Sequence, residues 1–65
     1  MNDTDMETLE FLLDEYFLPE VVANLSKICR LKADDLRGKD KETAKKFETY
    51  SDILKEVRDK IDNVL

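Results

Sequence analysis

Hydrophobic residues recur at alternating steps of three and four along the last third of the chain, from Phe47 to Val64. This spacing places them on one stripe of a continuous α-helix, and such a stripe must be buried against another helix. The pattern therefore predicts a long C-terminal helix packed along its length on a partner. The six residues of the stripe are Phe47, Tyr50, Leu54, Val57, Ile61 and Val64.

A second helical pattern runs from Pro19 to about Arg37. Gly38, the only glycine, follows it at the position where a left-handed C-cap residue is expected. Asp40 can cap the next helix, which leaves a link of roughly three residues, and so short a link forces antiparallel contact. The two segments are thus predicted to form a helical hairpin. The residues expected to be buried on its first helix are Val21, Val22, Leu25, Ile28, Cys29, Ala33 and Leu36.

A shorter helix is predicted before the hairpin, from about Asp5 to Phe17. Thr4 and Glu7 have the spacing of a capping box, in which both side chains satisfy free N–H groups at the helix start. Pro19 disfavours a helical Leu18 but suits the first turn of the next helix, so the break is expected there. The apolar arc of this first helix consists of Met6, Leu9, Leu12, Leu13, Tyr16 and Phe17.

These elements predict an all-α fold in which residues 1–65 form a single helical domain. The apolar face of the last helix is wider than one partner helix can cover, so a third helix must contribute. The first helix can do this within the chain, which gives a three-helix bundle, or two chains can pair as a dimeric helical bundle. We expect the homodimer, because Phe11, Leu18 and Leu31 stay exposed in the monomeric arrangement.

Charge is distributed unevenly along the chain, whose net charge is −5. Residues 1–20 hold seven acidic and no basic residues, whereas residues 21–65 hold eleven basic and nine acidic ones. The net acidity argues against general affinity for nucleic acid or anionic lipid, since both require Lys and Arg to neutralise phosphates. We expect no membrane association, and the charge pattern argues against nucleic-acid binding as well.

The residues that usually carry enzymatic chemistry are scarce. There is no histidine, and the single Cys29 lies among apolar helical positions, where a thiol packs as a small hydrophobe. Adjacent carboxylates such as Asp34 and Asp35 point in different directions on a helix and cannot hold one metal ion as a unit. We therefore predict a non-enzymatic protein without metal, cofactor or small-molecule substrate, and a cytoplasmic location for a chain with one thiol and no apolar span.

Lys32 falls within the apolar arc of the second helix, between Ile28 and Leu36. One interpretation is a stem that lies along the apolar surface and extends its ammonium group to water. The alternative is a polar device that fixes helix register, or an ion pair with a carboxylate of another helix or chain. The first interpretation is favoured, because long side chains at the edge of a bundle reach water easily.

An acidic amphipathic first helix suits a basic, hydrophobic groove on another protein. We therefore predict a small helical protein-interaction module, a regulator or inhibitor with a protein partner of unknown identity. The alternatives are a structural or accessory oligomerisation module and an acidic DNA mimic. The residues expected at the partner or dimer interface are Leu9, Phe11, Leu12, Tyr16, Phe17 and Leu18.

Overall fold

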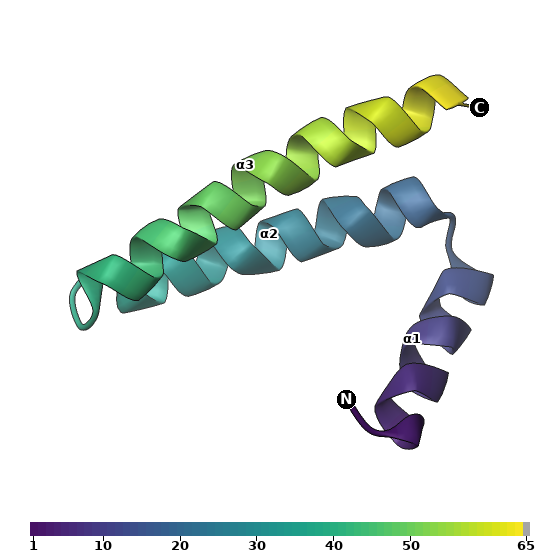
Figure 1. Ribbon diagram of the computed structural model, residues 1–65, viewed down its shortest axis with the longest axis horizontal. Coiled ribbons are helices and arrows are strands. Elements are labelled where there is room, and N and C mark those ends of the chain that lie inside the picture. Colours follow the sequence, from purple (N-terminus) through teal and green to yellow (C-terminus); the bar gives the residue numbers. More distant parts are fainter. Residues whose placement is uncertain (65) are drawn as a thin grey trace.

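The structure, a computed structural model, describes residues 1–64 and shows three α-helices and no strand in that range (Figure 1). α1 spans Asp3–Glu15, α2 spans Leu18–Leu36 and α3 spans Lys41–Val64. α2 and α3 run antiparallel beside each other. α1 is joined to the end of α2 that lies away from the α2–α3 turn, and it extends at a steep angle to α2. The predicted all-α fold, a helical hairpin preceded by a short N-terminal helix, is confirmed.

α1 begins two residues earlier than predicted, because Asn2 and not Thr4 is its cap. The side chain of Asn2 accepts a hydrogen bond of 2.8 Å from the amide of Asp5. Thr4 lies within the helix, so the predicted capping box is wrong. Asparagine is among the best N-cap residues, and Asp3 and Asp5 in the first turn favour this start electrostatically.

The junction between α1 and α2 is a pair of extended residues. Tyr16 has φ −125° and ψ 153°, and Phe17 has φ −72° and ψ 151°. α2 starts at Leu18 with Pro19 in its first turn, where a missing N–H costs nothing. The predicted break is therefore one to two residues further along the chain than the real one, and the extended pair directs α1 away from the hairpin.

The turn between α2 and α3 does not use a left-handed glycine, so that prediction for Gly38 is wrong. No residue between positions 1 and 64 has a positive φ. The chain instead leaves α2 in a right-handed turn, in which the Leu36 carbonyl accepts hydrogen bonds from Lys39 (2.9 Å) and Asp40 (2.7 Å). Asp40 does cap α3, as predicted, by accepting from the amide and hydroxyl of Thr43 at 3.1 and 2.6 Å.

The buried core lies between α2 and α3 and is built from small side chains. The buried residues in the described part of the chain are Val22, Ser26 and Ala33 of α2 and Ala44 and Ser51 of α3. Small residues at these positions let the two helix backbones approach closely. At the centre of the hairpin, small side chains of α2 therefore pack against small side chains of α3, as Ser26 does against Ser51.

Much of the apolar stripe predicted to be buried is exposed in the single chain. Tyr50, Val57 and Val64 of α3 are exposed, as are Leu25 and Ile28 of α2. The physical reason is that two helices can cover only the sides that face each other. The remainder of both apolar arcs has no partner within residues 1–64.

The three helices are spread in one layer, so that the molecule measures 37 × 31 × 14 Å (Figure 1). α1 contacts α2 only near their junction and reaches no described residue of α3. The radius of gyration is 13.5 Å, whereas a compact domain of this length has about 11 Å. The single chain thus does not close into the three-helix bundle that was one of the two expected arrangements.

Candidate protein-binding surface

α1 and α2 diverge from the extended junction and leave an open groove between them. The groove has a volume of about 350 Å³. Its walls are mainly apolar, although the Asn24 side chain is held on one wall by a hydrogen bond of 2.9 Å to the Glu20 carbonyl. The residues lining this α1–α2 groove are Leu9, Leu12, Tyr16, Glu20, Val21, Asn24, Leu25 and Ile28.

The structure brings together only half of the predicted interface residues. Leu9, Leu12 and Tyr16 line the groove, whereas Phe11, Phe17 and Leu18 do not. Phe11 is 60% exposed and Phe17 is 83% exposed, so both project into solvent outside the groove. These three residues therefore form separate exposed apolar positions at α1 and at the junction.

One wall of the groove was missed by sequence reasoning, which placed Val21, Leu25 and Ile28 in the hairpin core. Leu25 and Ile28 are instead exposed, and all three residues face the groove. The signal was present in the width of the α2 apolar arc. An arc that wide cannot be covered by a single partner helix, so part of it had to face elsewhere.

The hairpin has a second unpartnered apolar surface. Leu25 and Tyr50 immediately precede Ser26 and Ser51, the two residues at the contact between α2 and α3. In antiparallel helices these equivalent positions project from the same side of the pair. The residues on this side, here called the hairpin apolar face, are Leu25, Cys29, Tyr50, Leu54 and Val57.

Lys32 lies on the same side of α2 as the hairpin apolar face, seven residues after Leu25. Its side chain is exposed, as the favoured interpretation of the sequence expects. The ion pairs within residues 1–64 all involve arginines, so no carboxylate of that range lies within 4.0 Å of the Lys32 ammonium group. Lys32 is thus a cation beside an apolar surface without a carboxylate partner in the described chain.

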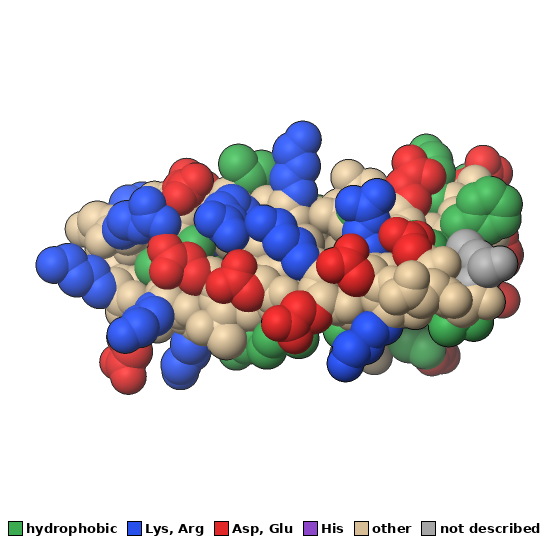
Figure 2. Space-filling model, turned by 90° about the horizontal axis from the view of Figure 1, so that it is seen from above, with side chains coloured by type: hydrophobic (Ala, Val, Ile, Leu, Met, Phe, Trp, Pro, Cys, Tyr) green, Lys and Arg blue, Asp and Glu red, His purple; other side chains and the backbone are tan. Residues whose placement is uncertain are grey.

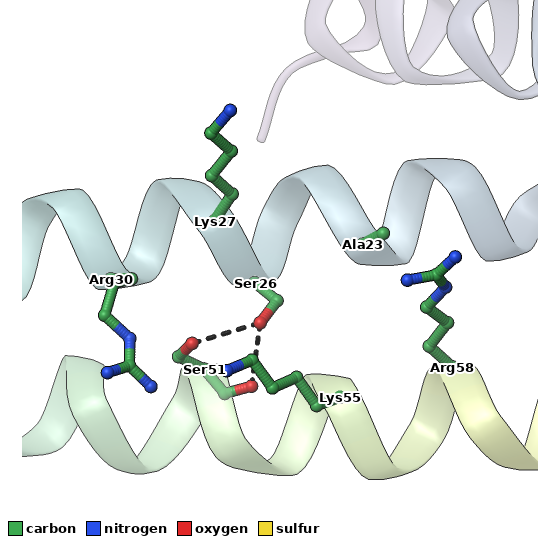
Figure 3. A pocket seen from close by; sticks show the side chains of 7 residues that line it. All are labelled: Ala23, Ser26, Lys27, Arg30, Ser51, Lys55 and Arg58. Atoms are coloured by element: carbon green, nitrogen blue, oxygen red, sulfur yellow. Dashed lines mark hydrogen bonds between the residues drawn. The ribbon is translucent and has the colours of Figure 1, made fainter.

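The opposite side of the hairpin carries a smaller, basic groove of about 240 Å³ above the two buried serines (Figure 3). Arg30 points toward α3, Arg58 points toward α2, and the Lys55 side chain extends over Ser51. Lys27 belongs to the lining but points away from α3. The groove therefore gathers cations from both helices.

Two of these cations already have carboxylate neighbours. Arg30 lies 3.4 Å from Asp52, and Arg58 lies 3.8 Å from Asp62. Seen from above in Figure 2, Asp and Glu side chains are interspersed with Lys and Arg along the hairpin. Mixed signs of this kind are typical of a solvated helix face held by weak ion pairs.

Residues with reactive or metal-binding groups are spread over the described chain. The Cys29 thiol is half-buried, and residues 1–64 contain no group of three His, Cys, Asp or Glu side chains placed to hold a metal ion. Hydrogen bonds from the Thr43 hydroxyl and amide hold the pKa of Asp40 below its ordinary value of 3.8. The low pKa of Asp40 follows from its role as the cap of α3.

Comparisons with protein families, with curated proteins and with solved structures gave no match to this chain. No helix between residues 3 and 64 has an apolar stretch that would cross a lipid bilayer. The described chain presents two apolar surfaces to solvent, the α1–α2 groove and the hairpin apolar face.

Proposed function

We propose that this protein is a small non-enzymatic protein-interaction module, a regulator or inhibitor that binds another polypeptide through its α1–α2 groove. The proposal includes a cytoplasmic location, where a lone thiol such as Cys29 stays reduced. The observation that carries the proposal is the groove itself, an open apolar channel between two helices. A channel of this kind suits an amphipathic helix, which binds by inserting a few apolar anchors.

The charge of the groove lining and of α1 favours a basic partner, because Glu20 is the charged residue among those that line the groove. α1 contributes acidic side chains and no basic ones, and within residues 1–64 no lysine or arginine lies within 4.0 Å of them. Acidic groups at the edge of an interface attract a basic partner and raise its association rate. The expected ligand is therefore an amphipathic helix with apolar anchors and basic flanks.

The test is affinity capture with the tagged 65-residue chain and two matched variants of α2. Ile28 lines the groove and is 48% exposed, whereas Leu31 is outside the groove and 55% exposed. Replacing a groove residue with a charged one should abolish capture, because the anchor pocket becomes polar. Ile28→Glu is therefore expected to lose the partner, and Leu31→Glu is expected to retain it.

A second comparison examines the exposed positions outside the groove. Phe11 and Leu18 were predicted from the sequence as interface residues, and both are exposed. If polar substitution of Phe11 and Leu18 leaves capture unchanged while Ile28→Glu removes it, the site is the groove alone. Equal capture by wild type, Ile28→Glu and Leu31→Glu would contradict the proposed function.

An oligomerisation module is the second candidate. It is favoured by the size of the single-chain core, in which Val22, Ala33 and Ala44 are the buried hydrophobic residues among residues 1–64. Such a module should assemble without capturing another protein. An acidic DNA mimic, in contrast, should bind its target with strong salt dependence and lose binding when Asp14 and Glu15 are neutralised.

A further inference from the structure

The single chain exposes more surface than a folded protein of its size. It exposes 5487 Å² for a mass of 7.6 kDa, whereas a compact monomer of that mass exposes about 4,300 Å². The surplus is about 1,200 Å² per chain, so two chains that covered it would bury about 2,400 Å² in total. That area lies within the range of stable homodimers.

The helices also form only one layer. Stable domains bury the apolar face of one layer against a second layer. In this chain α1 contacts no described residue of α3 and leaves Leu25, Tyr50 and Val57 of the hairpin apolar face exposed. The second layer therefore has to come from another molecule.

The chain carries two complementary surfaces, the apolar arc of α1 and the hairpin apolar face, which meet within one copy only where Leu25 lines the α1–α2 groove with Leu9 and Leu12. α1 is apolar on one arc and acidic elsewhere, and its carboxylates have no basic partner within 4.0 Å in the described chain. The hairpin apolar face is flanked by Lys32, which has no carboxylate partner in that range either. Two copies can cover the apolar surfaces and pair the free charges at once, because a two-fold axis forms each contact twice.

From these observations we propose that a second copy of this chain covers the hairpin apolar face. α1 of each protomer packs on α2 and α3 of the other, with its apolar arc over Leu25, Tyr50 and Val57. An acidic residue of the exchanged helix pairs with Lys32. The extended junction at Tyr16 and Phe17 supports the exchange, since it already holds α1 away from its own hairpin.

This inference goes beyond the proposed function, because it names a second copy of the chain as the partner and the hairpin apolar face as the surface that this copy covers. Its first test is sedimentation equilibrium of the 65-residue chain over a wide concentration range. The expected mass is twice 7.6 kDa, and the Tm should rise with concentration, because association stabilises the folded state. A helical chain of 7.6 kDa at every concentration would overturn the inference.

Two matched variants of α3 locate the interface. Tyr50 is on the hairpin apolar face and 47% exposed, whereas Ile53 points to the outer side of α3 and is 50% exposed. Tyr50→Glu should weaken association about tenfold or more, and Ile53→Glu should leave it unchanged. Circular dichroism of both variants checks that the helices still form. Equal association of the two folded variants would contradict the proposed face.

The exchange of α1 is tested by zero-length coupling of amines to carboxylates in a mixture of ¹⁴N- and ¹⁵N-labelled chains. The expected product joins Lys32 to an acidic residue of α1 in peptides that contain both isotopes. Products that contain one isotope only would show that α1 contacts its own hairpin, which overturns the exchange. Lys32→Glu should also weaken association, and added salt should reduce the difference between this variant and wild type.

The two proposals fail separately. If the chain remains a helical monomer, yet captures another protein and loses it on Ile28→Glu, the result overturns the proposed dimer and supports the interaction module. If the chain forms a dimer that dissociates on Tyr50→Glu, yet captures no other protein, the result supports the proposed dimer and contradicts a role as regulator or inhibitor.

Discussion

The Ser26 hydroxyl donates a hydrogen bond of 2.8 Å to the backbone carbonyl of Ser51, from which it is separated by 25 positions in the sequence. The two hydroxyl oxygens lie 3.0 Å apart, and both side chains are buried. Ser51 is completely inaccessible to solvent at the point where α2 and α3 are in contact. This polar pair fixes the register of the hairpin, because a shift of either helix would leave buried hydroxyl groups without partners.

Enlarging Ser51 is expected to separate the two helices. Ser51→Leu should lower the free energy of unfolding by about 1–3 kcal/mol, since a larger side chain has no room at a fully buried position. Urea denaturation measures the change. Thr49→Ala is the control, because Thr49 is exposed and its hydroxyl bonds only to the Lys45 carbonyl of its own helix. An effect of Ser51→Leu no larger than that of Thr49→Ala would show that α2 and α3 are not closely packed there.

Gly38 should tolerate a side chain, contrary to what its position in the sequence indicates. Its φ is not positive, and a Cβ atom built on it meets nothing within 4 Å. Gly38→Ala is therefore expected to raise the free energy of unfolding by about 0.4–1 kcal/mol, mainly because the unfolded chain loses conformational freedom. Thermal denaturation tests this. A clear loss of stability would mean that the turn is left-handed after all.

The cap of α3 makes stability depend on pH in the acidic range. The hydrogen bonds from Thr43 lower the pKa of Asp40 below 3.8, so the ionised carboxylate is favoured in the folded state. A lowered folded-state pKa adds stability above the unfolded-state value, and that stability is lost as the pH falls through the folded-state pKa. The Tm should therefore drop more in wild type than in Asp40→Asn as the pH falls from about 5 to about 2, which is the range in which carboxyl groups ordinarily titrate.

The asparagine variant isolates the charge, because asparagine can still accept the capping hydrogen bond. Asp40→Ala removes the cap entirely and should lower the Tm at neutral pH, where Asp40→Asn changes it less. Identical acid titration of Tm in wild type and Asp40→Asn would contradict the role of the carboxylate.

Local sequence signals predicted the hairpin well. The apolar period of residues 47–64 and the cap at Asp40 depend on neighbouring residues alone, and both the long α3 helix and its cap are observed. The start of α1 was harder to predict, because two nearby residues both give a good capping signal. Asn2 and Thr4 can both cap a helix, and the outcome depends on which start leaves fewer N–H groups unsatisfied.

Tertiary arrangement was beyond the sequence for a physical reason. Periodicity shows that Leu25 must be covered, but not by which element, so the groove wall was assigned to the core. Ser26 and Ser51 were also missed, because polar residues give no apolar signal and only their contact across the hairpin buries them. Sequence reasoning thus found the helices and left open what faces them.

Leu54 links the folding of one chain to its association. The sequence places it in the buried stripe of α3, yet in the single chain it is only half-buried on the hairpin apolar face. If a second copy covers that face, Leu54→Ala creates a cavity and should lower the free energy of unfolding by about 2–5 kcal/mol. In an isolated chain the loss should be smaller, since part of the side chain is already in water. Chemical denaturation at several protein concentrations separates the two cases, because only a dimer gives a midpoint that depends on concentration.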